Sequence, residues 1–194
     1  GFTVVLVARD RDRLMSAVRQ LVSRDHDVVG VPCDVSAPEQ VASLQQHLER
    51  LGPVEVVVNS AGVMSERMSK TLRASPQEWR RVLDVNLLGA AHVISTVGPG
   101  MVARRRGRIV NVSACMGRFT GSGLSGGLAP YRVSKAALNA LTRNFAAETG
   151  WGRRGLLVDA MCPGHCRTDM GGADAPRSPE EGAVSSARMA PADD

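Results

Sequence analysis

Tyr131 and Lys135 are the two side chains of this sequence whose types and spacing are best suited to proton transfer. They lie four residues apart in the segment PYRVSKAALNAL, so on a helix they share one face, one turn apart. A neighbouring ammonium favours phenolate over phenol and is expected to lower the tyrosine pKa from its ordinary value of about 10. Such a pair can donate or accept a proton near neutral pH. The same spacing also fits a half-exposed tyrosine beside an unrelated lysine.

The elements that would position this pair alternate along the chain. Short runs of β-branched and apolar residues predict strands buried on both faces, and helix-length amphipathic segments separate them. The alternation predicts one α/β domain with a parallel sheet and helices on both faces. The expected strands are residues 3–8, 28–32, 54–59, 108–113 and 155–162, and the expected helices are residues 10–23, 37–51, 76–102 and 131–149.

Several local signals mark where the helices begin and end. Residues 75–78 have the Ser-x-x-Glu spacing of a capping box, with a proline at the first helical position, and residues 36–39 repeat the same spacing. The Gly-Pro-Gly triplet at residues 98–100 is expected to break or kink the third helix. Residues 1–170 form the predicted folded domain, and residues 171–194 are predicted to be a loop or disordered tail with one helical turn near Glu180.

Polar and small residues follow the predicted strands, and in a doubly wound sheet the carboxyl ends of the strands form the ligand site. Small side chains at residues 60–62 would let the backbone approach a flat or phosphorylated ligand closely, although a tight turn would also require Gly62. The residues that follow the five strands are 8–10, 33–35, 59–62, 113–114 and 163–164.

Composition narrows the class of protein. The chain has 194 residues, 43% hydrophobic and 22% charged, which predicts one folded, water-soluble domain. Its four cysteines lack the dense spacing of a secreted disulfide scaffold, so a reducing, cytoplasmic location is expected. No apolar run approaches the length of a membrane span, so no membrane partner is expected.

The basic residues and the Cys/His residues predict neither a nucleic-acid site nor a metal site. Lys and Arg exceed Asp and Glu by 24 to 19, but the densest run, residues 104–106, has no interleaved aromatic residues and is interpreted as a solvated helix end. Cys162, His165 and Cys166 are interrupted by Pro163 and Gly164, and no second Cys/His pair follows to complete a tetrahedral shell.

Six motifs in order resemble those of the short-chain dehydrogenase/reductase family, and the resemblance covers nearly the whole predicted domain. They are Cys33-Asp34-Val35, Asn59-Ser60-Ala61-Gly62, Asn86 within DVNLLG, GRIVNVSACMG at residues 107–117, YRVSK with Tyr131, Ser134 and Lys135, and PGHCRTDM at residues 163–170. Each motif is weak alone, but their shared order and spacing are typical of this family, whose fold is a Rossmann-like doubly wound sheet.

The resemblance implies a role for each matching residue. Tyr131 would exchange a proton with a substrate oxygen while hydride moves to or from a nicotinamide. Lys135 would bind the nicotinamide ribose and lower the tyrosine pKa, and Asn86 would hold the helix kink and a water leading to Lys135. The implied cofactor contacts are Asp34 and Val35 at the adenine, Asn59, Ala61 and Gly62 along the cofactor, and Pro163, Gly164 and Thr168 beside the nicotinamide.

Arg9 occupies the position at which this family selects between its two dinucleotides. A guanidinium after the first strand suits the 2'-phosphate of NADP, whereas relatives that prefer NAD usually carry an acid in that loop. NADP is therefore the expected cofactor, with NAD less favoured.

Two departures from the family pattern affect the expected activity. The glycine-rich phosphate loop, with its strand and helix, belongs before Gly1, so a gap in the middle of the sheet is expected. The usual catalytic serine is replaced by Ala114. Ser113 would serve if the local frame slips, Ser122 or Ser125 would substitute from the following loop, or the substrate carbonyl would lack one hydrogen bond.

The sequence thus predicts an NADP-dependent oxidoreductase, similar to carbonyl reductases, acting on a small carbonyl or alcohol as a monomer or homo-oligomer. Ala114 and the missing phosphate loop also fit a non-catalytic relative that keeps the fold as a binding module.

Overall fold

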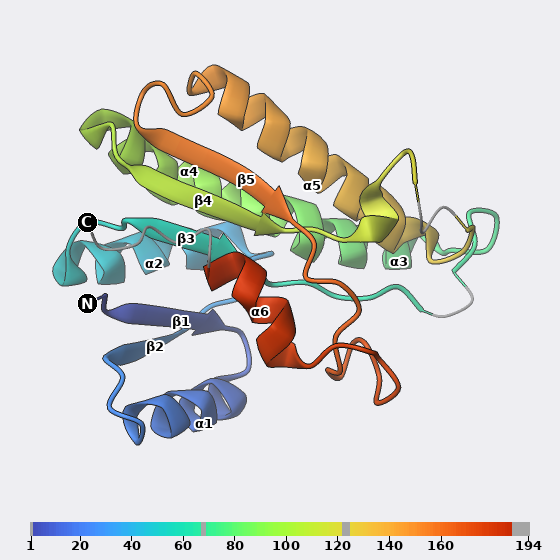
Figure 1. Ribbon diagram of the computed structural model, residues 1–194, viewed down its shortest axis with the longest axis horizontal. Helices are drawn as coiled ribbons and strands as arrows, with labels where there is room; N and C mark the ends of the chain where they lie inside the picture. The colour runs from blue at the N-terminus through green and yellow to red at the C-terminus, as the bar shows by residue number, and fades with distance from the viewer. Residues whose placement is uncertain (1, 67–68, 122–124, 188–194) are drawn as a thin grey trace.

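The computed structural model describes residues 2–66, 69–121 and 125–187 of the chain. Strands and helices alternate within these ranges, as predicted (Figure 1). The strands are β1 (Val4–Ala8), β2 (Val28–Pro32), β3 (Val56–Asn59), β4 (Gly107–Val112) and β5 (Leu156–Met161). The helices are α1 (Arg11–Val22), α2 (Pro38–Leu51), α3 (Pro76–Leu83), α4 (Gly89–Arg104), α5 (Ala129–Glu148) and α6 (Pro179–Ala187), with a π-helix η1 (Asp84–Leu88) and a 3-10 turn η2 (Cys115–Gly117).

All strand pairs are parallel, but they form two separate sheets. β1 pairs with β2, while β3, β4 and β5 pair in that order. Among the described residues no strand lies between β1 and β3, which confirms the predicted Rossmann-like α/β fold and the expected gap (Figure 1). Both facing edges expose apolar residues: Val4 of β1 and Val58 of β3 are each 45% exposed.

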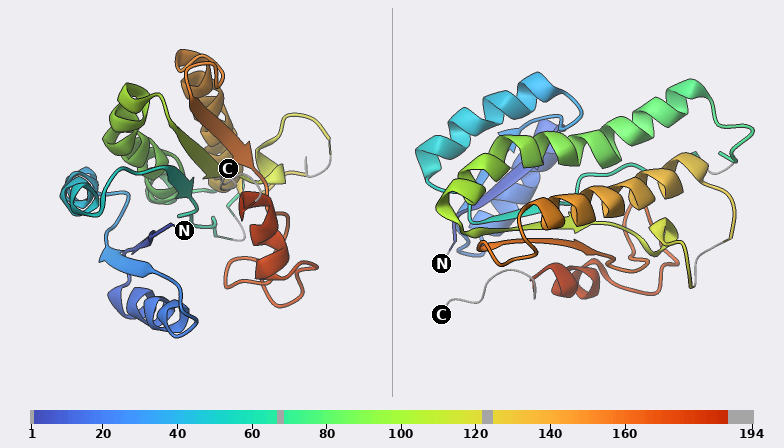
Figure 2. Two further views of the ribbon diagram at one scale, coloured as in Figure 1. Left: turned by 60° about the vertical axis from the view of Figure 1, so that its left-hand side comes forward. Right: turned by 90° about the horizontal axis from the view of Figure 1, so that it is seen from above.

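Each sheet is covered by its own helices. α4 packs against β4, α5 packs against β4 and β5, α2 packs against α4, and α1 packs against β1 and β2 (Figure 2). The core of the larger sheet is built from Ile94, Met101, Ile109 and Leu156, each at most 6% exposed.

The third predicted helix is continuous where a break was expected. It runs from α3 through η1 into α4, and Pro99 lies inside α4. Gly98 is buried against Phe145, where an added Cβ would lie 3.4 Å from the ring, so close packing onto α5 holds this segment helical. The stretch Pro76–Arg104 is long and apolar enough to cross a membrane, which corrects the sequence expectation; here it packs against α2, α5 and β4.

Two local predictions were wrong: the cap at Ser36 and the length of the helix in the tail. Ser75 caps α3 as predicted, accepting from the Glu78 backbone N–H at 3.1 Å. Ser36 does not cap α2, because its hydroxyl donates to Asp34 Oδ1 at 2.6 Å. Residues 179–187 form a full helix, α6, within the predicted tail, while residues 188–194 lie outside the described part of the chain.

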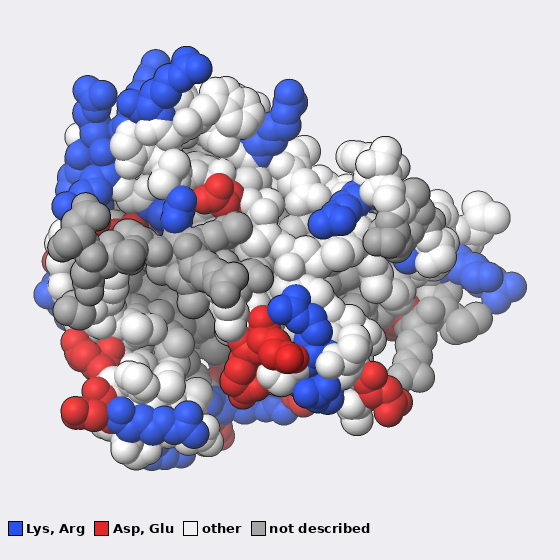
Figure 3. All heavy atoms as spheres, in the orientation of Figure 1, with Lys and Arg blue, Asp and Glu red and all other residues white. Residues whose placement is uncertain are grey.

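The arginine-rich run at residues 104–106 ends α4, as predicted. Arginines gather on this end of the molecule, at the upper left of Figure 3. Arg104 donates to the Val54 carbonyl at 2.9 Å, and Arg106 pairs with Glu55 at 2.9 Å. Two of these guanidinium groups therefore fasten the segment that leads into β3.

Candidate active site

Helix α5 places Tyr131 and Lys135 together beside the segments that follow the carboxyl ends of β3, β4 and β5. The helix begins after Leu128, whose φ is 51°, and Pro130 occupies its first turn. Tyr131 is 6% exposed and Lys135 5% exposed. The Lys135 ammonium lies 5.9 Å from the centre of the tyrosine ring and donates to the Val112 carbonyl at 2.7 Å. The predicted pair is thus one buried unit, tied to the end of β4.

The expected lowering of the Tyr131 pKa by Lys135 is not what the geometry produces. Burial raises the pKa of Tyr131, and the neighbouring Cys162 raises it further. Burial also lowers the pKa of Lys135 from 10.5 to about 8, with Cys162 acting in the opposite direction. The ammonium faces the Val112 carbonyl rather than the phenol oxygen, and burial destabilises its charge, so it does not overcome the desolvation of the tyrosine.

Asn86 lies in the π-helix η1 and joins three segments of the site. Its Oδ1 accepts from the Val63 backbone N–H at 2.7 Å, and its Nδ2 donates to the Val63 carbonyl at 2.9 Å and to Ser134 Oγ at 3.0 Å. The side chain is 1% exposed. A π-turn is an irregularity that often marks functional sites. Here it lets a helical residue bind the loop after β3 and the α5 face that carries Tyr131 and Lys135.

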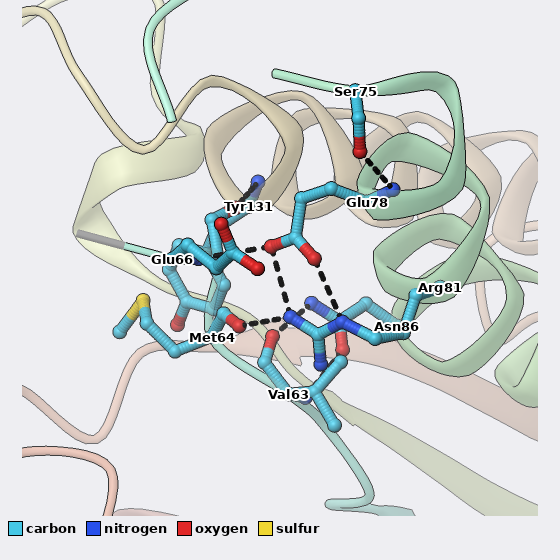
Figure 4. A network of polar contacts seen from close by, with 9 residues as sticks. Val63, Met64, Glu66, Ser75, Glu78, Arg81, Asn86 and Tyr131 are labelled. Atoms are coloured by element: carbon cyan, nitrogen blue, oxygen red, sulfur yellow. Dashed lines mark hydrogen bonds and ion pairs between the residues drawn. The ribbon is translucent and has the colours of Figure 1, made fainter. Parts of the chain in front are cut away.

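A second network, which the sequence reasoning missed, fixes the same loop (Figure 4). Glu78, 6% exposed, accepts from the Glu66 backbone N–H at 2.9 Å and pairs with Arg81 at 2.8 Å. Arg81 also donates to the Met64 carbonyl at 2.7 Å. The Ser65 hydroxyl in turn accepts from the backbone N–H of Tyr131 at 2.8 Å. The network therefore links α3 to the start of α5.

Ser113 and Ala114 occupy the stretch where the family carries its catalytic serine. Ser113 is buried, and its hydroxyl donates to the Lys135 carbonyl at 3.4 Å, so this side chain is used between β4 and α5. Ser125 is exposed and accepts from Arg132 at 3.3 Å, while Ser122 lies outside the described residues. Of the two candidates that the structure describes, neither Ser113 nor Ser125 forms a hydrogen bond with the Tyr131 hydroxyl.

Gly117 explains why the turn after Ala114 sits so close to the helix. An added Cβ on Gly117 would lie 2.7 Å from the Lys135 carbonyl carbon and 2.9 Å from the Ala136 nitrogen. Only a residue without a side chain lets η2 rest directly on the α5 backbone. The position of Ala114 relative to Lys135 is therefore set by backbone packing.

The predicted adenine and ribose contacts lie at the ends of β1 and β2. Arg9 is exposed, and Asp34 is close enough for Arg9 to contribute to its pKa. The Ser36 hydroxyl and backbone N–H lower the Asp34 pKa, burial opposes them with a smaller effect, and Arg9 adds the smallest lowering. Val35 packs under η1 and α4: a Cβ on Gly89 would meet it at 2.7 Å. Asp34 is thus a fixed anion beside Arg9.

Residues 59–62, which follow β3, lie between the predicted adenine contacts and Lys135 in the predicted cofactor site. Asn59 donates to Asn111 Oδ1 at 2.8 Å, which ties the ends of β3 and β4 together. Ala61 is exposed, and Gly62 lies beside Asn86 and Lys135, since an added Cβ would be 3.4 Å from Asn86 Oδ1 and 3.7 Å from the Lys135 ammonium. The absence of a side chain at Gly62 keeps the approach to Lys135 open.

The predicted nicotinamide contacts follow β5. Gly164 has a φ of 83°, a left-handed conformation that favours glycine, and the Pro163 carbonyl accepts from Arg177 at 2.7 Å. Thr168 Oγ1 accepts from the Gly171 backbone N–H at 3.1 Å and so lies in the loop beyond. Pro163 and Gly164 are adjacent to Cys162, which acts on both Tyr131 and Lys135, whereas no contact joins Thr168 to that pair among the described residues.

The model of the short chain dehydrogenase family matches residues 1–178. The chain belongs to this family. Among curated relatives of this short-chain dehydrogenase, the short-chain reductase protein NovJ of Streptomyces niveus is 33% identical over 171 residues, which is 88% of the chain and 62% of NovJ. Acetoacetyl-CoA reductase of Paracoccus denitrificans is 36% identical over 129 residues, covering 66% of the chain and 50% of that protein.

Solved structures of other short-chain dehydrogenases agree with this fold. A variant of the actinorhodin polyketide ketoreductase with NADPH matches with a TM-score of 0.78 and 31% identity over 88% of the chain and 64% of that structure. The gluconate 5-dehydrogenase of Burkholderia cenocepacia with NADP and tartrate matches with a TM-score of 0.77 and 26% identity, with the same coverage. The chain spans about three fifths of the length of several of the curated relatives that it matches.

Proposed function

We propose that this protein is an NADP-dependent oxidoreductase that transfers hydride between NADPH and a small carbonyl or alcohol, in the manner of a carbonyl reductase. The observation that carries the proposal is the buried Tyr131–Lys135 pair, held at the ends of the strands by Asn86 and by the Val112 carbonyl. Ketoreductase relatives and NADP-bound neighbours in the family support the reaction class.

In this proposal Tyr131 gives a proton to the substrate oxygen during reduction and takes it back during oxidation. Its raised pKa keeps the phenol protonated at neutral pH, which suits the reduction direction. NADPH supplies the hydride when it is bound. Lys135 places an ammonium beside Gly62, on the side where the cofactor ribose would bind, and its pKa of about 8 means that it loses this charge at mildly alkaline pH.

The residues present fit NADP in two places. Arg9 next to Asp34 offers a guanidinium for a 2'-phosphate, and Gly62 leaves the approach to the Lys135 ammonium clear for a ribose. The separation of β1 from β3 leaves the sheet incomplete between these two places. We therefore expect the 194-residue chain alone to bind NADPH weakly, and micromolar binding in a fluorescence titration would contradict this expectation.

Ala114 and the divided sheet favour one alternative, a non-catalytic family member that acts as a binding module. Without a hydroxyl at Ala114, a bound carbonyl would lack one hydrogen-bond donor, and removing such a donor commonly costs about 100- to 1000-fold in rate. This module would retain ligand binding while turnover is lost.

Turnover separates the two functions. NADPH oxidation is measured across a panel of small ketones and aldehydes, using the chain itself and the product of the gene extended upstream of Gly1. The oxidoreductase is expected to turn over and to lose activity by more than about 100-fold in Tyr131→Phe, because the proton donor is removed. Retained NADPH affinity in Tyr131→Phe controls for folding. Unchanged turnover in Tyr131→Phe would refute the mechanism, and no turnover by the extended protein would favour the binding module.

A further inference from the structure

Two cysteines from neighbouring strands meet at the candidate active site. Cys115 begins η2 just after β4, and Cys162 follows the last residue of β5. The parallel register sets Val112 opposite Met161, so the residues that follow both strands emerge side by side. The two sulfur atoms lie 2.9 Å apart, and the backbone N–H of Cys115 donates to Sγ of Cys162 at 3.0 Å.

We propose that Cys115 and Cys162 form a reversible disulfide that modifies this site. A disulfide has a sulfur–sulfur distance of about 2.05 Å, so closing the bond requires the two sulfur atoms to approach by only about 0.9 Å. Both side chains are partly exposed, so a small oxidant can reach them. The other two cysteines are placed differently: Cys33 is buried, and Cys166 Sγ faces the Pro163 carbonyl at 3.5 Å.

The oxidant is a small-molecule disulfide such as oxidised glutathione. In the first step one protein thiolate attacks the glutathione disulfide, forming a mixed disulfide and releasing one glutathione thiolate. The second protein thiol then loses its proton and attacks the protein sulfur of that mixed disulfide, releasing the second glutathione. The protein loses two electrons and two protons, and the glutathione disulfide is reduced to two thiols. Either thiol can make the first attack, since the two sulfur atoms lie 2.9 Å apart and each can resolve the mixed disulfide formed on the other.

The position of the pair links the disulfide to catalysis, and this step rests on the proposed function. Cys162 acts on the charges of both Tyr131 and Lys135, and Pro163 follows it directly. Cys115 follows Ala114, and η2 rests on the backbone of α5. Closing the bond pulls the start of the loop after β5 towards this turn. A displacement of about 1 Å near reacting groups can cost about 100-fold in rate, so oxidation is expected to lower turnover by about 10- to 100-fold.

The experiment maps the bond directly. Cys162 and Cys166 fall in one tryptic peptide, residues 155–167, so the mapping is done in a Cys166→Ser background. The reduced protein is equilibrated in glutathione buffers of increasing oxidised fraction, its free thiols are alkylated, and tryptic peptides are identified by mass. The expected product is peptide 109–118 linked to peptide 155–167, and reduction with dithiothreitol should reverse it. Cys115→Ser and Cys162→Ser should each abolish the linked pair.

The outcomes of mapping and turnover are distinguishable. Single glutathione adducts without the linked peptides, or a link made by Cys33 instead, would overturn the proposal. The bond and its effect would both be supported if the linked peptides form, oxidation lowers turnover, and turnover of Cys115→Ser does not respond to oxidation. Linked peptides with unchanged turnover would overturn the effect on catalysis. Linked peptides in an extended protein that shows no turnover in either redox state would support the disulfide and count against the proposed oxidoreductase function.

Discussion

Replacing Lys135 by methionine should change how the stability of the protein depends on pH. Burial lowers the pKa of Lys135 from 10.5 to about 8. In the unfolded chain the ammonium keeps its proton up to about pH 10.5, whereas the folded protein releases it at about pH 8. Between these values the unfolded state binds more protons, so raising the pH favours the folded state. Methionine has a similar shape and cannot titrate.

The size of the effect follows from the two pKa values. At about 1.4 kcal/mol for each tenfold change in proton affinity, the full penalty of burying the charged ammonium is about 3 kcal/mol at neutral pH. Between pH 7 and pH 9, the unfolding free energy of the parent should rise by about 1.3 kcal/mol relative to Lys135→Met. The raised pKa values of Cys33, Cys115 and Tyr131 act in the opposite direction at higher pH, but these groups are present in both proteins.

The measurement is urea unfolding at pH 7, 8 and 9, followed by tryptophan fluorescence. Trp79 in α3 and Trp151 after α5 both report on the part of the fold that contains Lys135. Lys70→Met, which removes the only other lysine, controls for the loss of a positive charge from the chain. A parent-to-Lys135→Met difference that stays flat or falls with pH would refute the reasoning, as would an equal pH dependence in Lys70→Met.

Three further substitutions test the site. Ala114→Ser supplies a hydroxyl where the family has one and should raise kcat by about 100-fold in a protein that turns over; an unchanged kcat in the NADPH assay would mean that the hydroxyl does not reach the substrate. Glu78→Gln should destabilise the fold by about 1.5 to 3 kcal/mol in urea at pH 7. Because Arg81 lowers the Glu78 pKa, the ionised carboxylate stabilises the parent above about pH 4.5, and this stabilisation is lost as the pH falls further and Glu78 is protonated. Equal stability of parent and variant at pH 7 would contradict a stabilising role of the Glu78 network. Gly117→Ala should cost about 1 to 3 kcal/mol through overpacking against α5, and a neutral effect on the melting transition would contradict the close approach of η2.

The alternation of elements could be predicted because each strand and helix carries its own local signal. The strand at residues 28–32 was predicted at the same bounds, and the other strand bounds differ by one or two residues. α6 was predicted only as one helical turn near Glu180, although Ser178 and Glu181 form a capping box with the same Ser-Pro pattern that correctly located α3. Its weak apolar periodicity hid that signal. Ser36 shows the opposite error, because a nearby carboxylate, Asp34, competes for its hydroxyl.

Only those site residues that belong to a recognisable sequence motif could be predicted. Tyr131 and Lys135 lie together and Asn86 binds Ser134 on the same helix, whereas the predicted direction of the Tyr131 pKa shift was wrong. Burial depends on segments far apart in the sequence, and sequence spacing carries no measure of it. The contact between Cys115 and Cys162 was missed for the same reason: only the register of β4 against β5 brings these residues together.

The division between the two sheets has a consequence for cooperativity. β1, α1 and β2 pack chiefly on one another, and an exposed ion pair between Arg13 and Asp169 adds little to their attachment to the rest of the fold. Such a unit can open without disrupting the core around Ile109 and Leu156. Backbone amides of β1 and β2 should therefore exchange with deuterium at a lower free energy of opening than those of β4. The chain would then lose the predicted adenine-side contacts, Arg9 and Asp34, while Tyr131 and Lys135 stay folded.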